Sequence, residues 1–236
     1  MFWLDPTYLI LMAPAFLLVL LAQWWVNSTY SKWSRVRNSL NMPGAEAARR
    51  LLQYAGLNDV RLENIPARLG DHYDPRQRVL RLSPGVAQEP SVAAVAIAAH
   101  EIGHAMQDHE GYLPLRFRSA LVPAVNLGSN LGWVLILIGL LMRGALGTQL
   151  AWLGVAAFAL GAIFAFATLP VELNASARAR QLLAQAGIVR GQEEQAAVGQ
   201  VLRAAAFTYV AALAAALLQL LYYVLLVSGM SGRRRR

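Results

Sequence analysis

Long runs of apolar residues alternate with shorter, mixed stretches along this chain. Four runs reach the length that a helix needs to cross a bilayer, about 20 residues: 8–26, 120–142, 150–169 and 204–227. No basic residue precedes the first run, as one would in a signal peptide, so we interpret this run as an uncleaved anchor. The pattern predicts about four transmembrane helices.

The mixed stretches predict a folded face outside the bilayer. Residues 44–54 have helical spacing, and residues 60–62 and 78–83 are strand-like. A turn is expected at 71–75, because Asp and Pro both favour turns. The predicted order is therefore a helix, a small sheet and then a further helix that begins near residue 91.

The composition fits a membrane protein and excludes several other classes. Hydrophobic residues make up 57% of the chain and charged residues only 14%, which is too apolar for an ordinary soluble domain. The net charge of +8 lies mostly beside the apolar runs, where membrane topology and anionic lipid explain it, so no nucleic acid partner is expected. Cysteine is absent, so any metal must be held by histidine and carboxylate.

Charge also predicts the orientation of the chain. Five Lys and Arg residues lie between positions 32 and 50, whereas the first seven residues carry only Asp5. The positive-inside rule then places residues 27–119 and 170–203 in the cytoplasm of a bacterial-type cell, with the spans in its inner membrane. Four crossings put the basic tail, 233–236, on the outer side, against the rule. Either the last segment does not cross fully, or the tail is outweighed by sixteen Lys and Arg residues on the other face. The tail also fits a lipid-headgroup anchor.

The alanine-rich helix expected after Ser91 carries the most informative motif, His100-Glu101-Ile102-Gly103-His104. Ser91 is a candidate N-cap, and Gly111 lies just past the expected end of the helix. Positions i and i+4 share one face of a helix, so both imidazoles reach one metal ion, while Glu101 turns about 100° aside toward a zinc-activated water. The motif predicts a zinc hydrolase site with Glu101 as the general base.

A catalytic zinc needs a third protein ligand, and Glu172 is the best candidate. It follows Pro170, which suits the first position of a new helical segment. Ser176 would share its face and could hold a ligand in place. Glu172 also fits a simpler role, as an acid in the first turn that compensates the helix dipole. His109 is turned about 140° from His104 and is better explained as a solvated residue.

Several ordered motifs resemble the YugP-like family of membrane-bound neutral zinc metallopeptidases. The resemblance runs nearly end to end, through 5–8, 72–75, 80–84, 98–107, 119–130 and 169–176. It implies one Zn²⁺ per chain, held by His100, His104 and Glu172 with Glu101 as the base. A more distant likeness is to HtpX and the CAAX prenyl proteases, in which Asp stands at the place of Ser176.

These observations predict a mainly α membrane protein with a zincin-like α+β cytoplasmic face that has a small β-sheet and an HExxH helix. The predicted function is a membrane-embedded zinc-dependent endopeptidase (HExxH + Glu type) whose substrates are peptides or proteins near the lipid bilayer. An intramembrane metalloprotease and an inactive zinc-binding scaffold are the alternatives. His72 is the first candidate for a second oxyanion donor, followed by Tyr73, Tyr112 and Arg178, although each also fits a role in supporting the fold.

The predicted organisation has five segments. They are a transmembrane anchor at 1–26, a zincin-like catalytic region at 27–119, a transmembrane hairpin at 120–169, a second cytoplasmic segment with the third zinc ligand at 170–203, and a transmembrane helix with a basic tail at 204–236. In a zinc protease, the exposed edge of the sheet can pair with an extended peptide and bring its scissile bond to the metal.

Overall fold

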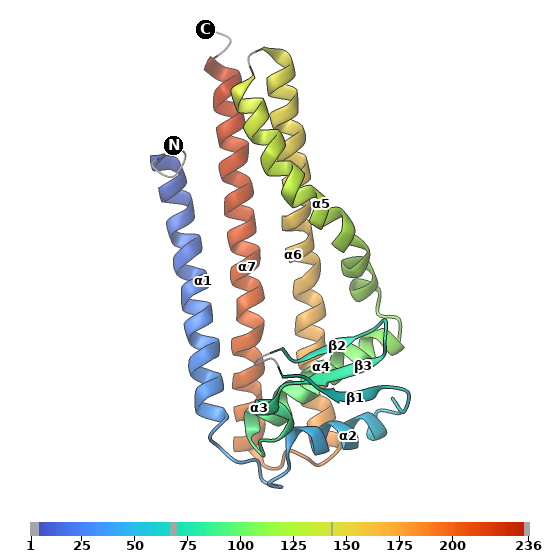
Figure 1. The fold of residues 1–236 in the computed structure, drawn as a ribbon. Helices are drawn as coiled ribbons and strands as arrows, with labels where there is room; N and C mark the ends of the chain where they lie inside the picture. Colours follow the sequence, from blue (N-terminus) through green and yellow to red (C-terminus); the bar gives the residue numbers. More distant parts are fainter. Residues whose placement is uncertain (1–4, 67–69, 143, 234–236) are drawn as a thin grey trace. The chain divides into compact units, whose positions relative to one another are not determined.

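The computed structural model of the chain describes residues 5–66, 70–142 and 144–233 (Figure 1). Residues 234–236 of the predicted basic tail, and Arg143 between the second and third predicted spans, lie outside the described residues. The elements in chain order are α1 (Pro6–Trp33), α2 (Gly44–Tyr54), β1 (Arg61–Asn64), β2 (His72–Asp74), β3 (Val79–Leu82), α3 (Pro84–Ala87), α4 (Val92–His109), α5 (Leu113–Leu141), α6 (Ala145–Gln185) and α7 (Gln192–Arg233).

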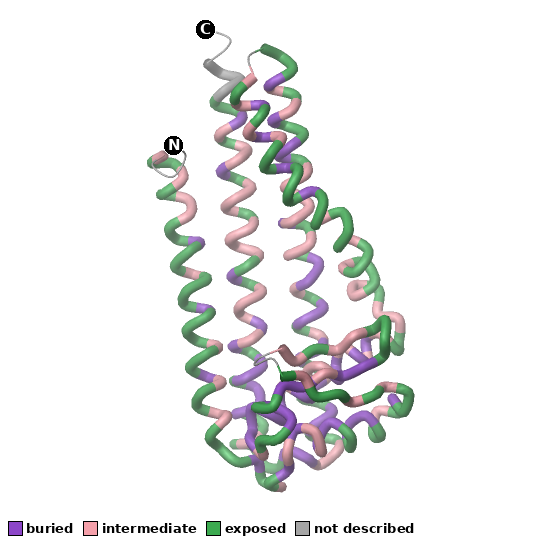
Figure 2. Tube along the Cα trace, viewed as in Figure 1, coloured by how far each residue is buried: buried purple, intermediate pink, exposed green. Residues whose placement is uncertain are grey.

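Within the described residues, four helices are long and apolar enough to cross a membrane, namely α1, α5, α6 and α7. This finding agrees with the prediction of about four transmembrane helices. Exposed side chains cover most of α1, whereas buried residues gather on α4 and around the sheet (Figure 2). An apolar helix exposed along most of its length is suited to lipid rather than to water.

The chain forms two compact units, and each of α1, α6 and α7 contributes residues to both. The helical unit comprises Met1–Leu21, Arg116–Leu169 and Tyr209–Arg236. The sheet unit comprises Ala22–Leu115 and Pro170–Thr208. In the helical unit, glycines allow α5 and α6 to approach closely: a Cβ added at Gly139 would lie 2.5 Å from the carbonyl oxygen of Gly147.

The sheet unit has a three-stranded sheet in the order β1-β3-β2. The central strand β3 pairs in parallel with β1 and antiparallel with β2, which leaves β1 and β2 as edges. Leu80 and Leu82 of β3 are buried in a core that also includes residues of α2, α3 and α4. This core packs the sheet against α4, and the motif lies near the middle of that helix.

Two of the predicted helices are confirmed, and local signals explain both. Residues 44–54 form α2, which buries Ala47, Ala48, Leu51 and Leu52 on one face. The alanine-rich segment forms α4, and the Ser91 side chain accepts a hydrogen bond from the backbone N–H of Ala94 at 3.1 Å, as an N-cap does. Gly111 has a positive φ of 65° just past the helix, a conformation that glycine adopts without strain.

The turn predicted at 71–75 is wrong in its position. Residues His72–Asp74 form β2, and the chain turns over the next four residues instead. Asp74 begins this turn, because its Oδ1 accepts hydrogen bonds from the N–H groups of Arg76 at 2.9 Å and Gln77 at 3.2 Å. The Asp-Pro signal was therefore correct for Asp74, but pairing with β3 extends the strand up to that residue.

The helix start predicted at Pro170 is also wrong. Pro170 lies inside the continuous helix α6. A proline within a helix removes one backbone hydrogen bond, but long apolar helices tolerate it where neighbouring groups compensate. Glu172 is therefore not in the first turn of a helix, and the explanation that it compensates a helix dipole no longer applies.

Helices α4 and α6 pack so closely in the sheet unit that their backbones touch. A Cβ added at Gly103 of α4 would lie 2.6 Å from the carbonyl oxygen of Ala175 on α6. Ala99, Ala175 and Ala179 are fully buried at 0% exposure, so small residues line this interface. Because Gly103 lies between the two histidines of the motif, this contact determines how closely α6 approaches them.

We predict that Gly103→Ala destabilises the protein, because the added methyl group has no room unless one helix backbone moves. Overpacking of this kind costs about 1–3 kcal/mol. The measurement is thermal unfolding of the detergent-purified protein. Gly199→Ala is the matched control, since the nearest atoms to its Cβ belong to the flexible side chains of Arg203, at 3.1 Å, and Arg180, at 3.8 Å. The control should be neutral or slightly stabilising, and equal stability of the two variants would contradict the prediction.

Candidate metal centre

The two histidines of the motif lie on one face of α4, as the i, i+4 spacing predicted. The rings of His100 and His104 are edge to face, with centroids 4.8 Å apart. Both side chains are mostly buried, at 13% and 14% exposure, which leaves each imidazole a narrow path to solvent. This arrangement directs two nitrogen atoms toward a common point beside the helix.

Glu172 of α6 lies at that point. Its Oε2 atom is 3.2 Å from Nε2 of His100 and 3.5 Å from Nε2 of His104. The side chain of Glu172 is only 4% exposed, so the carboxylate is almost wholly removed from water. The predicted ligands thus come together, although 72 residues separate His100 from Glu172 in the sequence.

The outer nitrogen of each imidazole has a partner of its own. Ser176 Oγ lies 3.2 Å from Nδ1 of His100, so this predicted supporting residue does contact the site. Gln107 Oε1 lies 3.0 Å from Nδ1 of His104. Partners of this kind orient metal-binding histidines and leave the opposite nitrogen free for the metal. Sequence reasoning missed Gln107, because its position three residues after His104 gives no sign of what it contacts.

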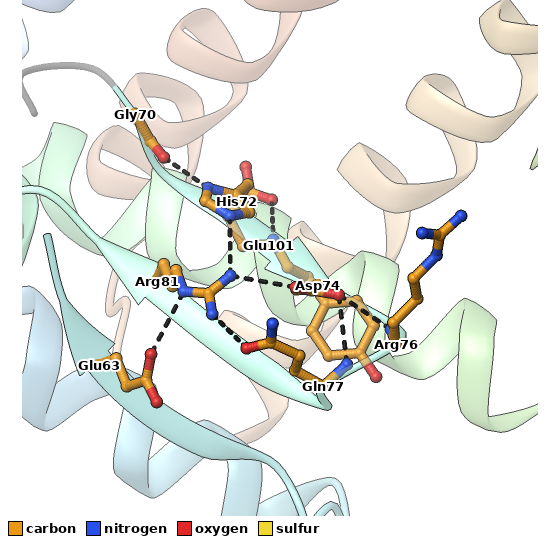
Figure 3. Close-up of polar contacts among 9 residues, drawn as sticks. Glu63, Gly70, His72, Asp74, Arg76, Gln77, Arg81 and Glu101 are labelled. Atoms are coloured by element: carbon orange, nitrogen blue, oxygen red, sulfur yellow. Dashed lines mark hydrogen bonds and ion pairs between the residues drawn. The ribbon is translucent and has the colours of Figure 1, made fainter. Parts of the chain in front are cut away.

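Glu101 is held beneath strand β2 (Figure 3). Its Oε2 accepts a hydrogen bond of 3.2 Å from the backbone N–H of Tyr73. The Tyr73 hydroxyl donates to Oδ2 of Asp108 at 2.9 Å, so the same residue fixes β2 to α4 at two points. Tyr73 was predicted as a candidate oxyanion donor, but its hydroxyl donates to Asp108 instead.

The charges of these groups alter one another's protonation. Burial raises the pKa of the Glu101 carboxyl above its ordinary value, although His100 and His104 oppose the change. Burial disfavours the protonated form of His104, but the carboxylates of Glu172 and Glu101 outweigh it and raise the pKa of this imidazole. The Glu101 carboxylate, with its raised pKa, therefore lies beside two imidazoles that both contact the carboxylate of Glu172.

The geometry fits a zinc ion. Three ligands about 2 Å from a tetrahedral zinc lie about 3.3 Å from one another. Two of the separations here are 3.2 and 3.5 Å, and the ligand atoms of His100, His104 and Glu172 all lie within 4.8 Å of one another. Two neutral imidazoles and one carboxylate are also a usual ligand set for catalytic zinc, which keeps a fourth position open.

The other predicted residues lie outside this group. His72 is exposed and contacts the Gly70 carbonyl, at 2.7 Å from its Nδ1, and Arg81 (Figure 3). Arg178 makes a bidentate ion pair with Glu110 and lies near the ring of Tyr112. The structure thus gives supporting contacts to these three candidates, and His109 is exposed at the end of α4.

Comparison with known proteins identifies the family. A family model described as "Putative neutral zinc metallopeptidase" matches residues 8–228, nearly the whole chain. The chain belongs to this neutral zinc metallopeptidase family. It is also 44% identical over 205 residues to the Bacillus subtilis (strain 168) protein named "Putative membrane protease YugP", covering 87% of this chain and 89% of that protein. No solved structure was found to match the chain.

Membership in the neutral zinc metallopeptidase family confirms the resemblance predicted from the ordered motifs. A zinc peptidase family implies zinc as the metal, and His100, His104 and Glu172 form a possible site for it. The match to a membrane protease agrees with the four apolar helices of this chain.

We predict that zinc affinity falls as the pH falls through the raised pKa of His104. Zinc binds the neutral imidazole, so below that pKa each bound ion must displace a proton. Exchange of one proton weakens binding by about tenfold per pH unit. Competition with a chromophoric chelator between about pH 8 and pH 5.5 measures this slope. His109→Gln, which removes an exposed imidazole from the same helix, should keep the slope, and a flat wild-type profile would be evidence against the prediction.

Proposed function

We propose that this chain is a membrane-embedded zinc-dependent endopeptidase. The observation that carries the proposal is the buried carboxylate of Glu172 beside the imidazoles of His100 and His104. A second carboxylate, Glu101, follows His100 directly on α4. A buried group of this charge needs a cation to balance it, and family membership names zinc. Zinc bound there would act as a Lewis acid that polarises a carbonyl and lowers the pKa of a water molecule.

Glu101 has the features of a general base. Its raised pKa gives it a higher proton affinity than an ordinary carboxylate, and the Tyr73 N–H holds one of its oxygens in place. In the proposed reaction, water attacks the carbonyl carbon of a peptide bond while Glu101 takes up a proton from it. The carbon–nitrogen bond then breaks, and Glu101 returns the proton to the leaving amine. The products are a carboxylic acid and an amine, which ionise in water to a carboxylate and an ammonium group.

Strand β2 is a suitable place for the substrate. It is an edge of the sheet, and its residue Tyr73 directs a backbone N–H away from β3 toward Glu101. A peptide paired along this edge by β-augmentation would run beside the base. Such binding recognises an extended backbone first and side chains second, which suits unfolded segments near the bilayer as substrates.

Glu101→Gln is the sharpest test of the mechanism, because it keeps the shape of the side chain and removes its basicity. We expect peptide cleavage to fall by about 10²–10⁴-fold. Zinc content should stay near one ion per chain, since His100, His104 and Glu172 remain. The measurement is cleavage of casein or a fluorogenic peptide by detergent-purified protein, alongside its metal content.

Glu89→Gln is the control for that substitution, since it changes an exposed carboxylate just before α4. It should keep full activity. Equal cleavage by wild type and Glu101→Gln would show that Glu101 is not the base. A wild type that binds zinc at these ligands yet cuts nothing would favour the scaffold alternative, and a wild type without zinc would contradict the proposed ligands.

We further propose that the sheet unit faces the cytoplasm of a bacterial-type cell, as the clustered basic residues after the first span indicate. The absence of cysteine allows a direct test with single introduced cysteines. We expect Asn58→Cys, at an exposed site of the sheet unit, to react with a membrane-impermeant thiol reagent only after cells are opened. Leu146→Cys, in the predicted outer part, should react in intact cells. The reverse pattern of labelling would show that the sheet unit does not face the cytoplasm.

A further inference from the structure

Gln107 is the most completely buried polar side chain near the candidate site, at 0% exposure. Its Nε2 donates to the backbone carbonyl of Val171 at 2.8 Å and to Oδ1 of Asn174 at 2.9 Å. Its Oε1 faces Nδ1 of His104 at 3.0 Å. One amide therefore joins a ligand on α4 to the backbone immediately before the ligand Glu172 on α6.

The partners of Gln107 determine which way its amide group points. A backbone carbonyl only accepts hydrogen bonds, so the group that faces Val171 must be the NH₂. Reversing the amide would place two oxygens against each other in a site without water contact, at the cost of an unsatisfied buried group. The oxygen of Gln107 must consequently face His104.

That orientation in turn fixes the proton of the imidazole. An amide oxygen has no proton to give, so Nδ1 of His104 must carry the hydrogen and donate it. The lone pair of the neutral ring is then on Nε2, the atom that lies 3.5 Å from Glu172. Only this tautomer offers a metal its electron pair on the inner side of the ring.

His100 lacks an equivalent constraint. Its Nδ1 faces the hydroxyl of Ser176, which can either donate or accept by rotating about its C–O bond. The two histidines therefore differ: the tautomer of His104 is set by a backbone carbonyl, whereas the partner of His100 adapts to either tautomer.

We propose that Gln107 is a positioning residue, which fixes the tautomer and orientation of His104 and ties that histidine to the backbone of the helix that carries Glu172. This inference rests on the proposed zinc site at His100, His104 and Glu172. Partners of metal-binding histidines commonly change metal affinity by about 10–100-fold when they are removed. Gln107 acts on zinc through His104 and does not itself contact the substrate.

Two variants separate the role of Gln107 from general stability. Gln107→Leu removes the acceptor and should weaken zinc binding by about 10–100-fold, measured by chelator competition on the detergent-purified full chain. Asn38→Leu is the matched control, because Asn38 is another buried amide of the sheet unit whose hydrogen bonds go to Met42. The control should unfold at a lower temperature but keep wild-type zinc affinity.

Wild-type zinc affinity in Gln107→Leu would overturn the proposal. A second measurement uses the wild type alone and so does not depend on how the variants fold. In zinc-loaded protein with ¹⁵N-labelled histidine, His104 should show a protonated Nδ1 and a metal-bound Nε2. Metal bound at Nδ1 of His104 would overturn the proposal.

Failure of this inference is distinguishable from failure of the zinc site. His104→Ala is measured in the same titration and should lose most of the zinc binding. A wild type that binds no zinc, or a His104→Ala variant that binds it normally, would contradict the proposed site itself. Normal binding by Gln107→Leu alongside lost binding in His104→Ala would contradict only the role assigned to Gln107.

Discussion

The close packing of α4 against α6 is the interaction on which the candidate site depends. Gly103 lies between His100 and His104, and a Cβ there would come within 2.6 Å of the Ala175 carbonyl oxygen. The missing side chain lets the two backbones touch, and Glu172 lies three residues before Ala175 on the facing helix. A wider separation would leave the three ligand atoms too far apart for one ion, whatever their chemistry.

This packing also creates an electrostatic demand. Glu172 is only 3% exposed, and a buried carboxylate without a partner is strongly unfavourable. The imidazoles of His100 and His104 stabilise the Glu172 carboxylate in part, and the pKa of His104 is raised as a result. A divalent cation bound there would balance the negative charge of Glu172 fully, and histidine would not need to be protonated. The burial that favours metal binding is also the burial that makes Glu101 a stronger base, so both properties have a single structural origin.

The sequence predicted those parts of the structure that local signals determine. Helix α4 was predictable because Ser91 and Gly111 mark its ends and alanine fills its length. Strand β2 was not, because Asp74 and Pro75 gave a strong turn signal, whereas the pairing with β3 that extends the strand to Asp74 is a tertiary effect. The helix start expected at Pro170 failed for the same reason, since surroundings decide whether a proline ends a helix.

Within the candidate site, the proximity of the three candidate ligands was predictable and the contacts that support them were not. The i, i+4 spacing of two histidines predicts, from the sequence alone, that both imidazoles lie on one face of a helix. The family resemblance indicated Glu172. Gln107 contacts Val171, 64 residues away, and nothing in the spacing indicates that pairing. Gly103 was visible within the motif, but only the position of Ala175 explains why a side chain is excluded there.

Ser176 illustrates how the charges of such a site limit its neighbours. In the HtpX and CAAX proteases that the motif distantly resembles, Asp stands at this position. Here a divalent cation bound at the candidate site would already balance the charges of Glu172 and Glu101 in poorly solvated surroundings. An aspartate beside His100 would add an uncompensated negative charge, whereas the Ser176 hydroxyl orients the same nitrogen without any. The serine is therefore compatible with a zinc site whose charges balance among the ligands and the base alone.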